Sequence, residues 1–239
     1  MAALPSALSG CTLTYFGLPG RGETTRMLLA IAGVKFTDER LAFQDWGALK
    51  PTAPFGSMPL LTLSTGFRLA QQRAIARFVG KHTGLYPEDP HAAALVDALM
   101  DALEDVQGIN GVGRGKPQAE KEADRLAAVS PGGKIYQVLA KIDAYIGEHG
   151  DGAGHCVGST LTIADVHLFS YTSNLGSGFF DGVPNTCTNT FSNIQRVRKC
   201  VADLPAVQAW FAADRPRSDY AKKIEANFVA AKDIDLSSL

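Results

Sequence analysis

The segment from Cys11 to Gly33 constrains the fold more than any other, because it predicts a strand, a tight turn and a helix in direct succession. It reads C-T-L-T-Y-F-G-L-P-G-R-G-E-T-T-R-M-L-L-A-I-A-G. Its first six residues alternate as in a strand with one buried face, and the glycines and proline at 17–22 indicate a turn. Met27 and Ile31 can share one helix face, and Gly33 suits the helix end. The N-terminal N–H groups of this helix should favour an anion beside the turn.

Two polar side chains flank the predicted turn. Tyr15 lies near the end of the strand and Arg21 lies near the start of the helix. A phenol donor, a guanidinium cation and free backbone N–H groups at one place suit a thiolate. A tyrosine in a strand is also often a packing residue. On this segment alone, both interpretations of Tyr15 stand.

Composition excludes several classes of function. The 239 residues carry a net charge of −1, which disfavours nucleic acid or an anionic membrane as the main partner. No apolar run is long enough to cross a membrane, and the first ten residues lack the basic and apolar regions of a secretory signal. The four cysteines show no metal-binding spacing, so we expect reduced thiols, no metal and a cytoplasmic protein.

The order of predicted elements divides the chain into two domains. Residues 1–85 read as strand, helix, strand, then two strands and a helix, which predicts an α/β domain with a small mixed sheet. Residues 91–239 predict an all-helical domain with helices at 92–109, 118–129, 134–146, 163–174, 191–201 and 206–213. The polar tail after Arg215 is expected to lie over the surface. Glycine-rich loops cover 147–159 and 176–190, and the second contains Phe179 and Phe180, candidates to cover a pocket.

The segment Thr162–Asp165 has the pattern of a helix capping box. The threonine hydroxyl would bind the backbone N–H of Asp165, and the carboxylate would bind back to the start of the helix. A catalytic role for Asp165 is an alternative, but the structural role is favoured. We therefore expect its loss to damage folding before chemistry.

Several runs of the chain together resemble a known family. They are L-T-Y-F-G-L-P-G-R-G-E, D-W-G-A-L-K-P-T-A-P-F-G-S-M-P-L-L, L-A-Q-Q-R-A-I-A-R-F, A-L-V-D-A-L-M-D and L-T-I-A-D. In this order and spacing the chain resembles a cytosolic glutathione S-transferase of the sigma-like class, from about residue 11 to 213. The resemblance implies a thioredoxin-like N-terminal domain, a helical C-terminal domain and a homodimer. It also implies conjugation of the glutathione thiolate to small apolar electrophiles in detoxification, with glutathione as co-substrate and no further cofactor.

The resemblance assigns roles to particular residues. Tyr15 would donate a hydrogen bond to the glutathione sulfur, and Arg21 would add positive potential. The other glutathione contacts that it implies are Trp46, Lys50, Met58, Pro59, Gln71, Gln72 and Asp101. A cis bond between Met58 and Pro59 would present backbone groups to the tripeptide. Gln72 departs from the family, which usually has serine there.

For three of these residues, the chemical group that would contact glutathione can be named. Trp46 and Lys50 would hold the glycine carboxylate through an indole N–H and an ammonium group. Asp101 would reach across a dimer to the glutamyl ammonium, although it is equally typical of an exposed helix carboxylate.

The electrophile site should lie between the two domains. Its expected lining is Phe16, Leu18, Asp105, Gly108 and Val112. Some sigma-like members isomerise prostaglandins and carry an aromatic wall late in the first long helix, where this chain has several glycines. A glutathione-dependent isomerase of the prostaglandin type is one alternative function. A non-catalytic ligand-binding or structural relative is the other.

Overall fold

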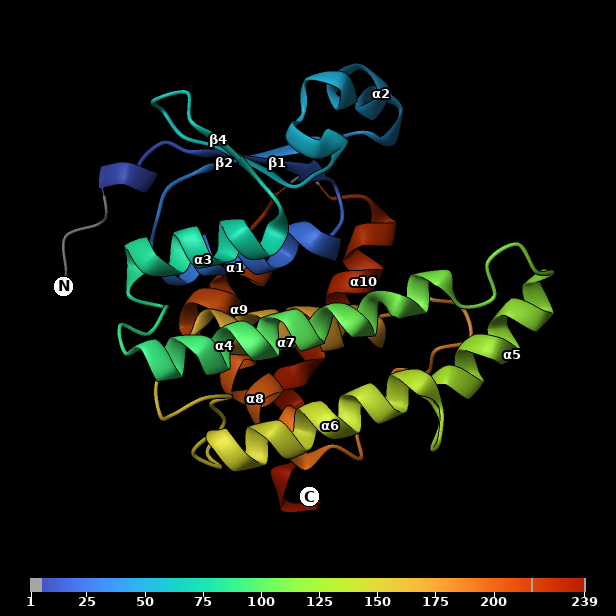
Figure 1. Cartoon of the computed structure of the whole chain (residues 1–239). Helices are drawn as coiled ribbons and strands as arrows, with labels where there is room; N and C mark the ends of the chain where they lie inside the picture. Colours follow the sequence, from blue (N-terminus) through green and yellow to red (C-terminus); the bar gives the residue numbers. More distant parts are fainter. Residues whose placement is uncertain (1–5, 216, 239) are drawn as a thin grey trace.

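A single four-stranded sheet lies at one end of the molecule (Figure 1). The computed structural model describes residues 6–215 and 217–238. The strands are β1 (Thr12–Phe16), β2 (Thr37–Leu41), β3 (Leu60–Thr62) and β4 (Arg68–Ala70), in the order β2-β1-β3-β4. The strand β1 pairs in parallel with β2 and antiparallel with β3, and β3 and β4 form an antiparallel hairpin. The predicted mixed sheet and its hairpin are confirmed.

Helices cover both sides of the sheet. The helices α1 (Glu23–Ile31) and α3 (Gln72–Thr83) lie between the sheet and the helical domain, while the short α2 (Trp46–Leu49) lies on the opposite side (Figure 1). Gly33, just after α1, has a φ of +67°, a conformation that glycine adopts without strain. The second strand begins three residues later than predicted. The predicted irregular stretch before Pro54 contains α2 and short 3-10 turns.

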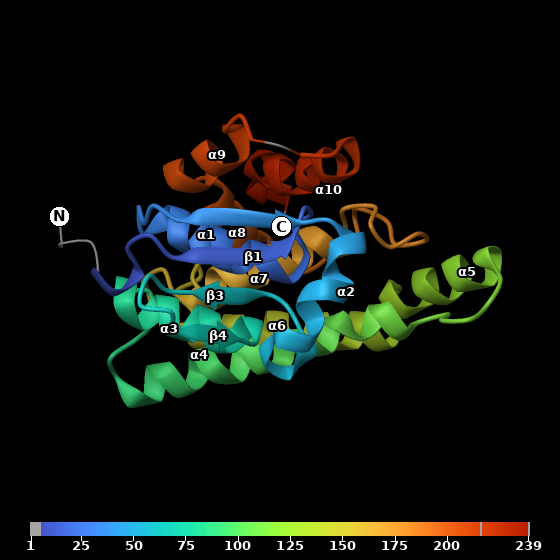
Figure 2. The same cartoon turned by 90° about the horizontal axis from the view of Figure 1, so that it is seen from above.

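Among the described residues, the chain after β4 forms helices and no further strand. The long helices are α4 (Pro90–Ala102), α5 (Gln118–Val129), α6 (Lys134–His149), α7 (Ile163–Leu175), α8 (Ser192–Ala202), α9 (Pro205–Ala212) and α10 (Asp219–Ala230). The helix α4 continues as a 3-10 helix, η6 (Leu103–Gly111). Figure 2 shows α5 extending away from the rest of the molecule.

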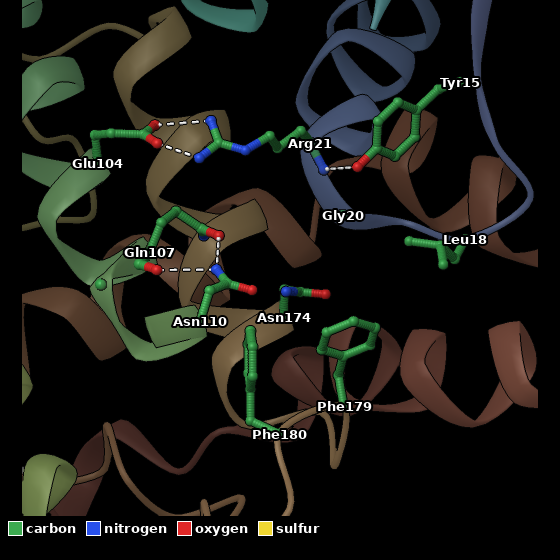
Figure 3. A pocket seen from close by; sticks show the side chains of 11 residues that line it. Tyr15, Leu18, Gly20, Arg21, Glu104, Gln107, Asn110, Asn174, Phe179 and Phe180 are labelled. Carbon is green, nitrogen blue, oxygen red and sulfur yellow. Dashed lines mark hydrogen bonds and ion pairs between the residues drawn. The ribbon is translucent and has the colours of Figure 1, made fainter. Parts of the chain in front are cut away.

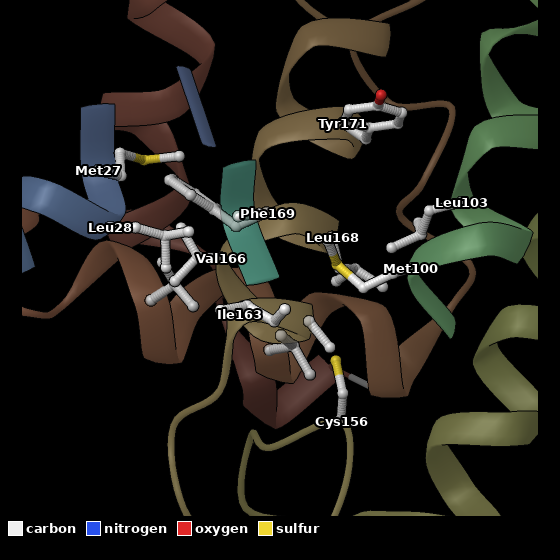
Figure 4. Packing of buried hydrophobic residues seen from close by; sticks show 14 of the residues in the cluster. Met27, Leu28, Met100, Leu103, Cys156, Ile163, Val166, Leu168, Phe169 and Tyr171 are labelled. Atoms are coloured by element: carbon white, nitrogen blue, oxygen red, sulfur yellow. The ribbon is translucent and has the colours of Figure 1, made fainter. Parts of the chain in front are cut away.

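The helix α7 forms the centre of the core, since all its residues are buried. It contacts α1, α4, α8 and α10. Figure 4 shows Met27 and Leu28 of α1 facing Phe169 of α7, with Met100 on the other side of that helix. One continuous cluster therefore contains most of the buried apolar residues from both halves of the chain.

The polar tail predicted after Arg215 is a packed helix, which corrects the sequence interpretation. Within α10, Ile224 and Phe228 are almost fully buried, and the Phe228 ring centroid lies 5.6 Å from that of Phe169. The apolar residues of α10 recur at helical spacing between charged ones, so the segment is amphipathic rather than polar throughout. The buried carboxylate of Glu225 is paired with two arginines.

The first glycine-rich loop is folded by its own side chains. Asp151 accepts hydrogen bonds from three backbone N–H groups and from the ring of His155, and these bonds, opposing its burial, lower its pKa to about 2. Cys156, which lies in this loop, is fully buried. Among the described residues, no three His, Cys, Asp or Glu side chains cluster as metal ligands. No described helix has the length and apolar character needed to cross a membrane.

Candidate active site

The phenol of Tyr15 lies at the turn between β1 and α1, and the local sequence is shaped around it. Its hydroxyl oxygen accepts a hydrogen bond from the backbone N–H of Arg21 at 3.1 Å. A Cβ atom on Gly22 would lie 2.6 Å from the Tyr15 ring, and one on Gly20 would lie 2.8 Å from its hydroxyl. Both glycines of the G-R-G turn are therefore required by the close approach of the phenol.

The Tyr15 hydroxyl remains protonated at neutral pH. The residue is only 8% exposed, and this burial raises the pKa of the phenol. The N–H of Arg21 and the charges of Arg26 and Arg21 oppose the rise without cancelling it. Because the oxygen already accepts a hydrogen bond, its proton is available for donation to an anion.

A partly buried polar network ties the Arg21 side chain to the helical domain. The guanidinium makes a bidentate ion pair with Glu104 of η6. The hydroxyl of Tyr171 lies 3.1 Å from Glu104 Oε2 and 2.9 Å from Gln72 Oε1, so it shares one proton between them. Burial lowers the pKa of Arg21, but the hydrogen bond and charge of Glu104 outweigh it, and the net pKa is raised.

The side chain of Gln72 turns into the protein, so its predicted contact with glutathione stays a prediction for the backbone alone. It is buried, and its Nε2 lies 2.9 Å from Nδ1 of His167 while its Oε1 accepts from Tyr171. Burial lowers the pKa of His167 to about 3, so the neutral ring can accept the hydrogen bond. The long amide spans to α7, where a serine could not reach. At this position only the backbone is left for a ligand.

The other predicted glutathione residues of the N-terminal half lie between α2 and the start of α3. The Met58–Pro59 bond is cis, and Pro59 is buried. Trp46 and Met58 both pack on a small cluster of Ala53, Leu60 and Ala70. Gln71 follows this cluster directly with a φ of +72°, and its side chain is exposed. Lys50 is also exposed.

Asp101 lies on the outer face of α4. Its carboxylate is 3.4 Å from Arg73 and 3.2 Å from Arg77, both on α3, and its side chain is 62% exposed. The Asp101 carboxylate thus forms ion pairs within its own chain. Its expected contact with glutathione across a dimer stays a prediction.

An open cavity of about 440 Å³ lies beside Tyr15 and Arg21 (Figure 3). The other residues that line it are Leu18, Gly20, Glu104, Gln107, Gly108, Asn110, Asn174, Phe179 and Phe180. Leu18 and Gly108 were expected in the electrophile site, and Phe179 and Phe180 were candidates to cover it. The cavity is therefore shared between the β1–α1 turn, η6, α7 and the second glycine-rich loop.

Three residues expected in the electrophile site lie elsewhere. The ring of Phe16 stacks on Phe43 with centroids 4.4 Å apart, outside the cavity lining. Asp105 lines a separate groove between α4 and α6, and Val112 packs against the core.

The 3-10 geometry of η6 sets which of its residues share one face. With three residues per turn, Glu104, Gln107 and Asn110 share the face toward the cavity. The spacing of these polar residues was the signal that could have found them. Asn174, a polar residue at the end of an apolar helix, was another.

The family of the chain follows from comparison with known proteins. Family models of the glutathione S-transferase N-terminal domain and C-terminal domain match residues 11–81 and 112–214. The chain belongs to the glutathione S-transferase family, a family of enzymes.

Individual relatives cover most of the chain. It is 33% identical over 213 residues to glutathione S-transferase 1 of Ascaris suum, covering 87% of this chain and 98% of that protein. It is 32% identical over 216 residues to hematopoietic prostaglandin D synthase of Gallus gallus, covering 86% and 96%. The solved sigma class enzyme of Fasciola hepatica superposes with a TM-score of 0.72 at 26% identity, covering 87% and 98%.

Replacing Gln72 by leucine should destabilise the protein by about 2 kcal/mol, because it removes the two buried hydrogen bonds that its amide makes with His167 and Tyr171. Urea unfolding measures the effect. Gln44→Leu, on an exposed side chain, is the matched control and should change stability by less than about 0.5 kcal/mol. Equal stability of the two variants would show that the amide of Gln72 does not hold α3 to α7.

Proposed function

We propose that this protein conjugates the thiolate of glutathione to small electrophiles. The observation that carries the proposal is the neutral, buried phenol of Tyr15 at the edge of an open cavity, its oxygen held by the N–H of Arg21. A donor fixed in this way stabilises an anion more than a neutral thiol, and so lowers the pKa of a bound thiol. Arg21 adds positive potential at the same place, which its ion pair with Glu104 reduces.

The magnitude of the proposed effect is within reach of these groups. A free thiol titrates near ~8.5, and lowering its pKa by about two units requires about 2.7 kcal/mol. A hydrogen bond to a charged group contributes about 1.5–3 kcal/mol. The N-terminus of α1 adds about 0.3–1 kcal/mol. Together with the proximity of the bound electrophile, a reactive thiolate at neutral pH accounts for the catalysis.

Glutathione would lie along the predicted contacts between α2 and the start of α3. Trp46 and Lys50 would hold its glycine carboxylate, and the backbone of Met58 would pair with its cysteine unit. Gln71 and the free N–H groups at the start of α3 would bind the glutamyl end. Glutathione would be the co-substrate, and we propose no other cofactor.

The finer assignments are proposals of the same kind. We infer a sigma-like class, a role in detoxification, a cytoplasmic location and a homodimer. Support for the location comes from the four cysteines, which are all free. Support for the homodimer comes from Phe55, which is 82% exposed, and from the apolar groove between α4 and α6.

A second candidate function is glutathione-dependent isomerisation of the prostaglandin D synthase type. The similarity to the Gallus gallus enzyme favours it. It uses the same thiolate and differs only in the electrophile pocket. The face of η6 toward the cavity here carries Glu104, Gln107, Gly108 and Asn110 rather than an aromatic wall, which favours conjugation.

A conjugation assay with an aryl halide, together with calorimetric titration by glutathione, tests the proposal. We expect saturable glutathione binding and turnover. Binding of apolar dyes with no conjugation across a panel of electrophiles would identify a ligand carrier instead. Prostaglandin D formation without conjugation would identify the isomerase.

A further inference from the structure

The side chain of Asn174 is an unpaired polar group in the wall of the cavity beside Tyr15. The residue is 7% exposed and lines the cavity, and its Oδ1 has no hydrogen-bond partner among the residues that the structure describes. Its backbone carbonyl is already satisfied by the hydroxyl of Ser177. A buried amide oxygen without a partner costs about 1–3 kcal/mol. A ligand in the cavity that donates a hydrogen bond to this oxygen would remove that cost.

Asn110 offers a second amide on the same wall. Its Nδ2 donates to the backbone oxygen of Gln107 at 2.9 Å and to its Oε1 at 3.1 Å, which fixes the amide. The Oδ1 of Asn110 is left to accept, and in Figure 3 it is turned toward the side where Asn174 lies. The two amides thus form one polar patch opposite the phenol.

The part of the lining next to Asn174 is apolar and aromatic (Figure 3). Phe179 and Phe180 come from the second glycine-rich loop, with ring centroids 4.8 Å apart and planes at 80°. Phe180 is buried and lies under the guanidinium of Arg125, whereas Phe179 is partly exposed in the cavity beside Leu18. A flat aromatic body can pack on this wall.

The charges of the cavity disfavour an acidic ligand. Arg21 and Glu104 are the cation and the carboxylate of the lining, and they are paired with each other. A carboxylate on the electrophile would meet Glu104 with no unpaired cation among the lining residues. The polar group of the ligand should therefore be neutral.

From this arrangement we propose the class of electrophile, resting on the transferase function proposed above. The substrate is an aromatic electrophile with a neutral hydroxyl group, whose ring packs on Phe179 and whose hydroxyl binds Asn174 and Asn110. A hydroxyl both donates and accepts, so it can donate to one amide oxygen and accept from the other amide. The amide of Asn110 is fixed by Gln107, whereas the terminal torsion of Asn174 turns easily.

Three benzylidene acetones test this assignment. They carry a hydroxymethyl, an ethyl or a carboxylate group para to the enone; the first two match in size and electronic effect. In each, the thiolate sulfur forms a bond to the β-carbon, the double-bond electrons move to the α-carbon, and that carbon takes a proton from water. Nothing leaves. We expect kcat/KM about tenfold higher for the hydroxymethyl compound than for the ethyl compound, and lowest for the carboxylate.

Asn174→Leu should reduce the preference for hydroxymethyl over ethyl to about twofold or less, and Asn110→Leu, on a more exposed residue, should reduce it in part. Asn189→Leu, on an exposed side chain outside the cavity, should keep it. Thermal unfolding checks that each variant is folded. Equal rates for the two compounds in the wild type, a preference that survives both substitutions, or a preference for the carboxylate would overturn this assignment while leaving the transferase intact. No conjugation of any of the three, or of an aryl halide, would instead refute the proposed function.

Discussion

Replacing Tyr15 by phenylalanine is expected to lower the rate of aryl-halide conjugation by about 50-fold near pH ~6.5 and by less than about fivefold near pH ~9. With the phenol present, about half of the bound thiol is ionised at the lower pH. Without it the pKa returns toward ~8.5, and about one molecule in a hundred is ionised. At the higher pH both proteins hold mostly thiolate, so the difference shrinks.

The affinity for glutathione should change little, because the phenol contacts one atom of the tripeptide. Steady-state kinetics at several pH values separates the effect on the conjugation rate from the effect on glutathione affinity. Tyr136→Phe, on a half-buried ring that packs on Phe191, is the control and should retain the wild-type profile. Unchanged activity of Tyr15→Phe at pH ~6.5 would show that the phenol takes no part in the mechanism.

Replacing Asp165 by alanine should destabilise the protein by about 3 kcal/mol. The carboxylate is fully buried and accepts from the N–H groups of Cys156 and Thr162, each at 2.6 Å, and from the Thr162 hydroxyl at 2.9 Å. Its loss leaves these donors without a partner at the start of α7, the central helix of the core. The predicted capping box is confirmed by these bonds.

Urea unfolding followed by circular dichroism measures this effect. Asp219→Ala, in the first turn of α10 with a 99% exposed side chain, should cost less than about 0.5 kcal/mol. Activity per folded molecule of Asp165→Ala should stay near wild type. A variant of full stability that has lost turnover would indicate a catalytic role instead.

Elements with strong local signals could be predicted from the sequence. The strand, glycine turn and first helix follow from alternation and from residues that suit few other conformations. The helix Gln118–Val129 has the predicted bounds, and the capping box fixed the start of the helix at Ile163. In each case the deciding interactions lie within a few residues of one another.

Features set by distant partners could not be predicted. The inward turn of Gln72 depends on His167 and Tyr171, about a hundred residues later in the chain. The packing of η6 against α6 and α7 decides that Glu104 faces the cavity and Asp105 does not, and these partners lie far along the chain from η6. The packing of α10 likewise depends on Phe169 of α7.

The most direct test is the ionisation of glutathione on the protein. The ultraviolet absorption of the bound thiolate, followed as a function of pH, gives the pKa of the sulfur. We expect a pKa about two units below ~8.5 in the wild type and a value near ~8.5 in Tyr15→Phe. A bound thiol that titrates like a free one, or a lowered pKa that persists without the phenol, would contradict the account.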